Sequence, residues 1–115
     1  MSIFHIAHVS DWQDALESGS YRVSTRDAMI HEVGYIHASR DRDQVSRVAM
    51  FVYSDDPLPL CVLELDESAI SAAGVTIRFE DGGDGEDFPH VYGALDPRWV
   101  TAVLRARFEE GTFVY

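Results

Sequence analysis

Two segments alternate strictly between apolar and polar side chains, which is the pattern of strands with one buried face. In residues 75–80 the apolar side chains Val75, Ile77 and Phe79 are expected to point inward. Residues 100–108 show the same period of two. Shorter apolar segments between turn residues predict further strands at 3–8, 20–25, 34–39, 60–65, 88–95 and 111–115. The fourth of these is apolar at nearly every position, which predicts a central strand covered on both faces.

Two other segments, 10–19 and 40–56, follow the helical period of 3.6 residues. In the second, apolar side chains recur at positions i, i+3, i+4 and i+7, namely Val45, Val48, Ala49 and Val52. Ser10 and Asp41 stand at expected N-caps, each with a glutamine three positions later, and Gly19 suits a left-handed helix end. Two helices with about six or seven strands predict an α+β sheet fold.

Three segments carry turn signals rather than a period. Residues 26–33 predict a polar loop, and residues 66–74 predict a turn or a single helical turn. The acidic, glycine-rich segment 81–87 does not have the D-x-D-x-D-G spacing and closing glutamate of a calcium loop. It therefore predicts a mobile acidic turn that leads into the strand beginning near Pro89.

Length and composition set the class of protein. The chain has 115 residues, 46% hydrophobic and 25% charged, so we expect one globular domain over residues 1–115. No apolar run approaches the roughly 20 residues of a membrane span, and the N-terminus lacks the features of a signal peptide. We therefore expect a cytoplasmic protein with no membrane partner. The single cysteine, Cys61, excludes an internal disulfide and is expected to fill core space.

The charge balance argues against one class of partner. Nine basic residues oppose 20 acidic ones, giving a formal net charge of −11. Such a chain repels nucleic acid unless its charges are strongly segregated, and the arginines at 40–47 are interleaved with acids. We expect no nucleic-acid binding.

Two predicted strands place a histidine and a tyrosine on one face. In GYIHAS, residues Tyr35, His37 and Ser39 share a face, and in FPHVYG, His90 and Tyr92 do so. Imidazole and phenol groups lining a concave sheet offer donors, acceptors and stacking surface for a polar ligand. The alternative is that these histidines are packed and hydrogen-bonded and have only a structural role. The pattern leaves both interpretations open.

The other histidine in a predicted strand is His5, and we expect the rings of His5, His37 and His90 to converge on one concave surface. Glu80 could add a carboxylate, but no H-E-x-x-H motif, H-x-H motif or cysteine pair is present, so no metal is expected. The chain also lacks the G-x-S-x-G elbow of a serine hydrolase and a glycine-rich phosphate loop.

Several motifs resemble, in the same order, those of a bacterial family known as domain of unknown function 952. They are FHIAH, DWQDALESGSY, GYIHAS, QVSRVAMFVY, IRFED and FPHVYGALD, which span nearly the whole chain. The fold of that family is similar to the ADP-ribosyltransferase superfamily, including the RNA 2′-phosphotransferase branch that consumes NAD. The resemblance implies split antiparallel sheets, two helices and NAD held in the cleft between the sheets.

The resemblance also implies roles for individual residues. His5 matches a position on the first strand that holds ribose or amide, and GYIHAS supplies the group framing nicotinamide, either His37 or Tyr35. The third position in the superfamily is usually an acid, whereas FPHVYG supplies His90. This departure puts ADP-ribose transfer to protein in doubt. Glu80 could be the displaced acid or a solvated surface residue, and the phosphotransferase branch acts on RNA, which the charge disfavours.

Three hypotheses follow. The first is an ADP-ribosyltransferase-like enzyme that takes NAD or a related nucleotide as co-substrate. Its catalytic residues are His5, His37, His90 and Glu80, and its substrate-binding residues are Tyr35, Ser39 and Tyr92. The second is a non-enzymatic binding module for a small anionic ligand, and the third is a protein-interaction domain whose histidines are structural.

Overall fold

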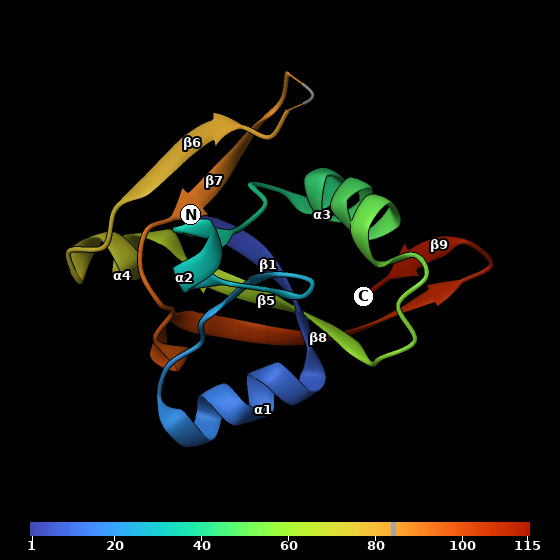
Figure 1. The fold of residues 1–115 in the computed structure, drawn as a ribbon, viewed down its shortest axis with the longest axis horizontal. Coiled ribbons are helices and arrows are strands. Elements are labelled where there is room, and N and C mark those ends of the chain that lie inside the picture. Colours follow the sequence, from blue (N-terminus) through green and yellow to red (C-terminus); the bar gives the residue numbers. More distant parts are fainter. Residues whose placement is uncertain (84) are drawn as a thin grey trace.

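A four-stranded antiparallel sheet forms one half of the computed structural model, which describes residues 1–83 and 85–115 (Figure 1). Its strand order is β1–β5–β8–β9, with bounds Ser2–His8, Leu60–Asp66, Val100–Glu109 and Thr112–Val114. β5 lies between β1 and β8 and is buried on both faces, which explains its continuous apolar sequence and confirms the prediction of a central strand. One position of the predicted acidic turn, Asp84, lies outside the described residues.

A second antiparallel sheet lies beside the first and has the order β4–β7–β6, with bounds Ile36–His37, Asp87–Val91 and Ile77–Asp81. Backbone hydrogen bonds of 2.8 and 2.7 Å between Phe4 and Ser39 connect β1 to the chain just after β4. A small hairpin of β2 (Val23–Thr25) and β3 (Ala28–Met29) completes the strands described. The predicted α+β class with antiparallel sheets is therefore confirmed.

Four α-helices occur among the described residues: α1 (Val9–Ser18), α2 (Ile30–Val33), α3 (Arg42–Val48) and α4 (Glu67–Ala72). The sequence predicted α1 and α3, and a turn or single helical turn where α4 lies. The polar loop predicted at 26–33 is wrong, because these residues form β3 and α2. Asp41 caps α3 as expected, since its carboxylate accepts a 2.8 Å hydrogen bond from the Gln44 amide. Ser10 does not cap α1, because that helix begins at Val9 with His8 at its N-cap, so Ser10 lies inside the first turn.

Two short helical segments complete the chain. A π-helical turn, η1 (Ala49–Tyr53), continues α3, and a 3-10 turn, η2 (Pro97–Trp99), precedes β8. Within the described parts of the chain, no helix is long and apolar enough to cross a lipid bilayer.

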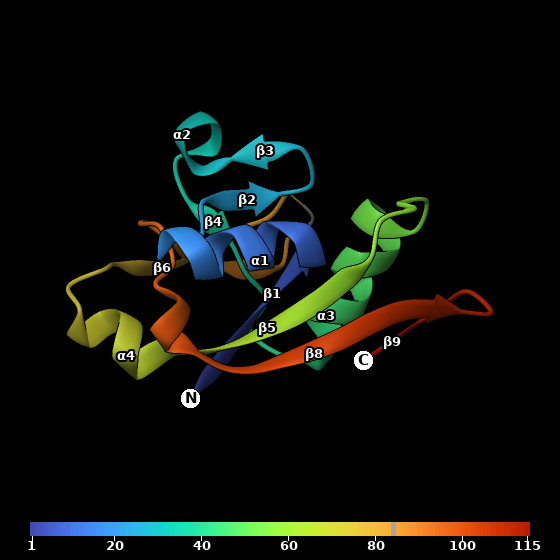
Figure 2. The same cartoon turned by 90° about the horizontal axis from the view of Figure 1, so that it is seen from below.

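Two apolar clusters cover the two faces of the large sheet. The first includes Trp12 of α1, Leu63 of β5 and Ile36 of β4, so it joins both sheets to α1 (Figure 2). The second includes Val45 of α3 and Phe113 of β9. The small sheet therefore packs one face against the first cluster and leaves its other face turned away from it.

The expectation that Phe79 points inward is wrong, because 47% of its surface is exposed. It lies opposite Pro89 near the tip of the β6–β7 hairpin, which extends beyond the rest of the molecule (Figure 1). Alternation gives the face of a strand correctly, but the core ends before this part of β6. Ile77, earlier on the same face, is partly buried against the first cluster.

Candidate functional site

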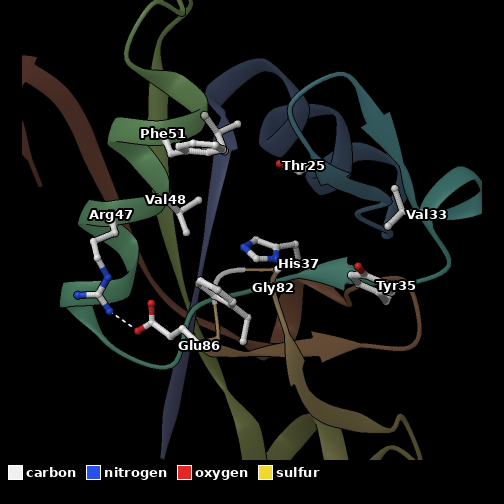
Figure 3. A pocket seen from close by; sticks show the side chains of 12 residues that line it. Thr25, Val33, Tyr35, His37, Arg47, Val48, Phe51, Gly82 and Glu86 are labelled. Carbon is white, nitrogen blue, oxygen red and sulfur yellow. Dashed lines mark hydrogen bonds and ion pairs between the residues drawn. The ribbon is translucent and has the colours of Figure 1, made fainter.

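A cleft of about 520 Å³ opens between the α3–η1 segment and the small sheet (Figure 3). Its walls are mainly apolar and include Val48, Phe51, Val52 and Phe88. Polar groups reach it from His37, Arg47 and Glu86. A concave, mostly apolar site of this volume with a few polar groups has the character of a small-molecule site.

The strand register brings most of the predicted site residues together on one face of the small sheet. His37 lies opposite His90, and His90 in turn lies opposite Arg78. Directly opposed residues point to the same side of an antiparallel sheet, and residues two apart along a strand share that side. Tyr92 and Glu80 therefore belong to the same face. Spacing predicted that Tyr92 lies with His90, and the register adds Glu80.

Aromatic rings form a continuous row along this face. The ring centroids of Phe88 and His37 are 5.0 Å apart, and those of His37 and His90 are 5.8 Å apart. Tyr35 stacks on His90 at 3.9 Å with an interplanar angle of 15°, and it lies 5.6 Å from Tyr92. Of this row, Phe88, His37 and Tyr35 line the cleft.

His90 is held by a carboxylate on the side of the row away from the cleft. Its Nδ1 lies 2.8 Å from Oε1 of Glu80, and the Tyr92 hydroxyl donates to the same oxygen. These two hydrogen bonds, that from Tyr92 first, hold the pKa of the Glu80 carboxyl below its ordinary value. The His90 ring is buried and does not line the cleft. Glu80 thus orients His90 and is not free surface.

His5 is a structural residue in this geometry. It is only 3% exposed, its Nδ1 lies 2.6 Å from the carbonyl oxygen of His37, and its Nε2 lies 2.9 Å from the Tyr21 hydroxyl. The carbonyl can only accept, so Nδ1 donates and Nε2 accepts from Tyr21. Burial lowers the pKa of His5 to about 4, so the ring is neutral near pH 7. His5 supports the site by fixing the backbone of His37.

His37 is the histidine that faces the cleft (Figure 3). Burial, with a smaller contribution from the proximity of His90, lowers its pKa to about 4, so this ring is also neutral. No other described residue makes a hydrogen bond to either ring nitrogen. Only His37 faces the cleft, so the expected convergence of the three rings on one concave surface is wrong: His5 and His90 are buried and do not line it.

Ser39 does not lie in the 520 Å³ cleft. Its backbone is paired with Phe4, its side chain is buried, and it borders a separate cavity of about 10 Å³ that His37 also lines. That volume suits a single water molecule. A ligand in the large cleft therefore does not reach Ser39 in this structure.

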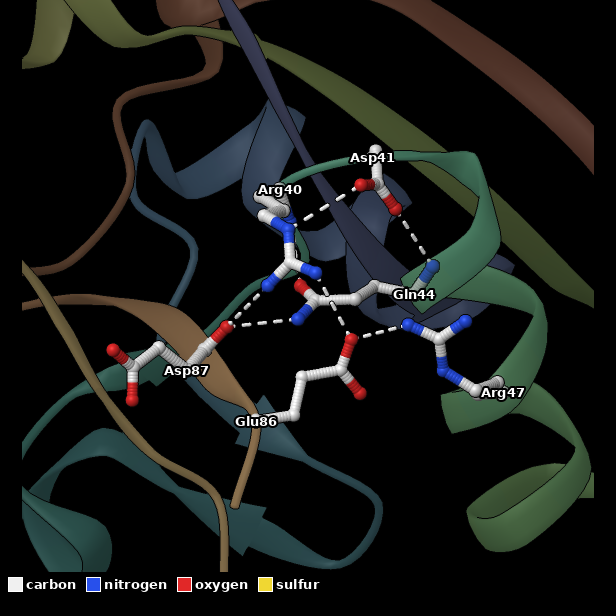
Figure 4. Close-up of polar contacts among 6 residues, drawn as sticks. All are labelled: Arg40, Asp41, Gln44, Arg47, Glu86 and Asp87. Atoms are coloured by element: carbon white, nitrogen blue, oxygen red, sulfur yellow. Dashed lines mark hydrogen bonds and ion pairs between the residues drawn. The ribbon is translucent and has the colours of Figure 1, made fainter. Parts of the chain in front are cut away.

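A polar network at the mouth of the cleft ties the β6–β7 hairpin to α3 (Figure 4). The Glu86 carboxylate pairs with Arg40 at 3.1 Å and also contacts Arg47. Arg40 and Gln44 donate to the backbone carbonyl of Asp87 at 2.9 and 2.8 Å. The hydrogen bond from Arg47 is the main cause that holds the pKa of Glu86 below its ordinary value.

The sequence did not reveal Arg47, Glu86 or Phe51 as part of the site. Arg47 and Glu86 are 39 residues apart, and neither belongs to a recognisable motif. Phe51 offered one signal, because it is a large aromatic residue off the apolar stripe of its helix. It is 90% exposed and lies on the π-helical turn at the rim of the cleft.

Metal ligands do not gather in the part of the chain that the structure describes, where no group of three or more His, Cys, Asp or Glu side chains could hold an ion. The prediction that the purified protein carries no zinc remains to be tested by elemental analysis.

Comparison with known proteins agrees with the fold. An X-ray structure of protein CC0527 from Caulobacter crescentus has a TM-score of 0.81 and 21% identity, covering 99% of this chain and 94% of that chain. Its solution NMR structure gives a TM-score of 0.75 at 21% identity, covering 97% and 90%. At this identity the likeness concerns the fold alone, and no curated protein matches the chain. The family described as "Protein of unknown function (DUF952)" matches residues 6–103, and the chain therefore belongs to this family.

Proposed function

We propose that the cleft binds a small molecule with a planar aromatic part and a polar group directed at His37. The observation that carries this proposal is the position of His37, which lines an apolar cleft while no described residue makes a hydrogen bond to its ring nitrogens. Burial lowers the pKa of this ring to about 4, so near pH 7 it offers one donor and one acceptor. A polar group that loses water without gaining a partner costs about 1–3 kcal/mol. A ligand that fills the cleft must therefore supply a hydrogen bond to this ring, which makes His37 a determinant of specificity.

The aromatic part of the ligand follows from the walls. Phe88 and Tyr35 present ring surface on the sheet side, and Phe51 does so on the helix side. Stacking of a base on an aromatic side chain contributes about 1–3 kcal/mol. The exposure of Phe51 and its place on a π-helical turn, a feature frequent at functional sites, support its role as a ligand contact.

An enzyme that uses NAD as co-substrate is the second candidate. It is supported by the presence of a carboxylate, that of Glu86, and the imidazole of His37 in the lining of one cleft. In such an enzyme His37 would contact the nicotinamide of NAD. His5, His90 and Glu80 would position His37 and would not touch the substrate. We favour ligand binding over catalysis, because a histidine with a pKa of about 4 is poorly matched to proton transfer near pH 7.

Fluorescence of the neutral probe N-phenyl-1-naphthylamine tests the binding site, because its quantum yield rises in an apolar cleft. Phe51→Ala should weaken probe binding about tenfold. Phe79→Ala is the matched control, since it removes an exposed phenylalanine outside the cleft. Equal affinities of the two variants would show that the probe does not use this cleft.

The same proteins distinguish binding from turnover. Thermal melts with NAD, ADP-ribose, adenosine monophosphate and adenosine report stabilisation by a bound ligand. If the protein releases nicotinamide from NAD and His37→Ala abolishes this release, the result would support the transferase hypothesis. Stabilisation without nicotinamide release would support a binding module.

A further inference from the structure

Two arginines meet one carboxylate oxygen at the mouth of the cleft. Nη2 of Arg40 lies 3.1 Å from Oε1 of Glu86, and Nη2 of Arg47 contacts the same atom (Figure 4). Both arginines are solvent-exposed, and Arg47 and Glu86 line the cleft together. The carboxylate therefore occupies the point where two guanidinium groups converge beside an apolar cavity.

This geometry matches the way proteins bind oxyanions. Guanidinium groups present fixed forks of N–H donors that suit carboxylate and phosphate oxygens, and charge-assisted hydrogen bonds of this kind are among the stronger ones. Arg40 is oriented independently of Glu86, because its Nε lies 3.3 Å from Asp41 and its Nη1 donates to the Asp87 carbonyl. The donors on Arg40 thus keep their position if the Glu86 side chain leaves.

We propose that Arg40 and Arg47 form an anion-binding subsite of the cleft, and that Glu86 is an internal occupant that the ligand displaces. The inference rests on the proposed function, because it assigns an oxyanion, phosphate or carboxylate, to the ligand whose aromatic part lies in the cleft. A phosphate brings up to two negative charges and three acceptor oxygens, so it can satisfy both arginines better than one carboxylate oxygen does.

Displacement of Glu86 leaves the cleft wall in place. The hairpin stays attached to α3 through the Asp87 carbonyl, which accepts from Arg40 and Gln44 without the Glu86 side chain. Ion pairs exposed to solvent are weak, so their exchange for a ligand anion meets little resistance. The net charge of −11 disfavours the binding of small inorganic anions. The subsite therefore binds the anionic group of a ligand whose apolar part lies in the cleft.

A matched pair of fluorescent probes tests the subsite. 1-Anilinonaphthalene-8-sulfonate carries an anion on nearly the same rings as the neutral N-phenyl-1-naphthylamine. Glu86→Gln should tighten the sulfonate probe about three- to tenfold, and Arg47→Gln should weaken it by a similar factor. Neither substitution should change the neutral probe. Arg98→Gln, which alters an exposed arginine paired with Asp96 and outside the cleft, is the control.

Competition then distinguishes the two sources of the anion. Displacement of the sulfonate probe by adenosine monophosphate and not by adenosine assigns a phosphate, whereas displacement by 1-naphthoate and not by naphthalene assigns a carboxylate. Either result supports the subsite, and failure of both anions overturns it. Failure of the sulfonate probe to respond to Glu86→Gln overturns it as well.

The two proposals fail in different ways. If Phe51→Ala leaves the neutral probe unaffected, the cleft is not the binding site and the proposed function fails. If the neutral probe depends on Phe51 but the sulfonate probe is indifferent to Glu86 and Arg47, only the anion subsite fails. Circular dichroism of each variant confirms that the comparison is made between folded proteins.

Discussion

Replacing His5 with glutamine should make the stability of the protein less sensitive to mild acid. In the folded state His5 is buried, donates to the His37 carbonyl and accepts from Tyr21. Burial lowers its pKa from 6.5 to about 4. Between these two values the unfolded chain binds a proton at His5 that the folded chain does not. Stability from this residue is therefore fully present above pH 6.5 and is lost as the pH falls toward 4.

The magnitude follows from the size of the shift. A shift of the His5 pKa from 6.5 to about 4 corresponds to about 3 kcal/mol in the free energy of unfolding. This contribution changes by at most about 1.4 kcal/mol per pH unit. His37 has the same direction and the same folded pKa of about 4. The two histidines together should lower the free energy of unfolding by about 2 kcal/mol between pH 6 and 5, and removal of His5 should halve this change.

Urea unfolding at pH 7, 6 and 5 measures this change. At pH 7, His5→Gln should destabilise the fold by about 1–3 kcal/mol, because its amide restores the partners of His5 incompletely. The deficit should shrink by about 2 kcal/mol at pH 5. His31→Gln, at an exposed position on α2, is the control and should follow the wild type. Parallel pH profiles of wild type and His5→Gln would refute the assignment of a neutral buried imidazole.

Four further outcomes are expected. Tyr21→Phe removes the donor to Nε2 of His5 and should lower the free energy of unfolding by about 1–2 kcal/mol, measured in urea at pH 7. Asp56→Ala should lower the free energy of unfolding by about 3 kcal/mol, because its carboxylate is 2% exposed and lies 2.6 Å from His8 and 3.2 Å from Arg26. Asp55→Ala is the control and should leave the melting temperature nearly unchanged, because the Asp55 side chain is 83% exposed. Elemental analysis of protein purified without added metal should find no stoichiometric zinc, and about one zinc per chain would contradict this. Titration with generic RNA or DNA should show no salt-sensitive binding, and affinity tighter than micromolar would contradict the charge argument.

The sequence predicted those parts of the site that depend on a local period. Alternation along a strand places Tyr35 with His37, and His90 with Tyr92, whatever the strands pair with. The register of β4, β7 and β6 then brings these two sets together with Glu80. The continuous apolar sequence of β5 likewise predicted a central strand, because both faces of that strand are covered.

The position of His5 could not be obtained in the same way. Its neighbours in IFHIAH are apolar on both faces, so alternation does not say whether the ring meets solvent or core. Only the packing of Tyr21 and the His37 backbone around it decides this. The Arg47–Glu86 contact depends in the same way on the approach of α3 to the β6–β7 hairpin, which no local pattern encodes.

The three strand histidines differ in their surroundings, and the proposed function assigns them different roles for that reason. His5 has both nitrogens engaged in the interior, and His90 is held by Glu80 and stacked on Tyr35. His37 lies between them, with its backbone fixed by His5 and its ring beside His90. A ligand-binding group must be held in one orientation before the ligand arrives, and surrounding residues supply that support. If His37 binds the ligand as proposed, the two buried histidines support it, and their substitution should alter ligand affinity only through the position of that ring.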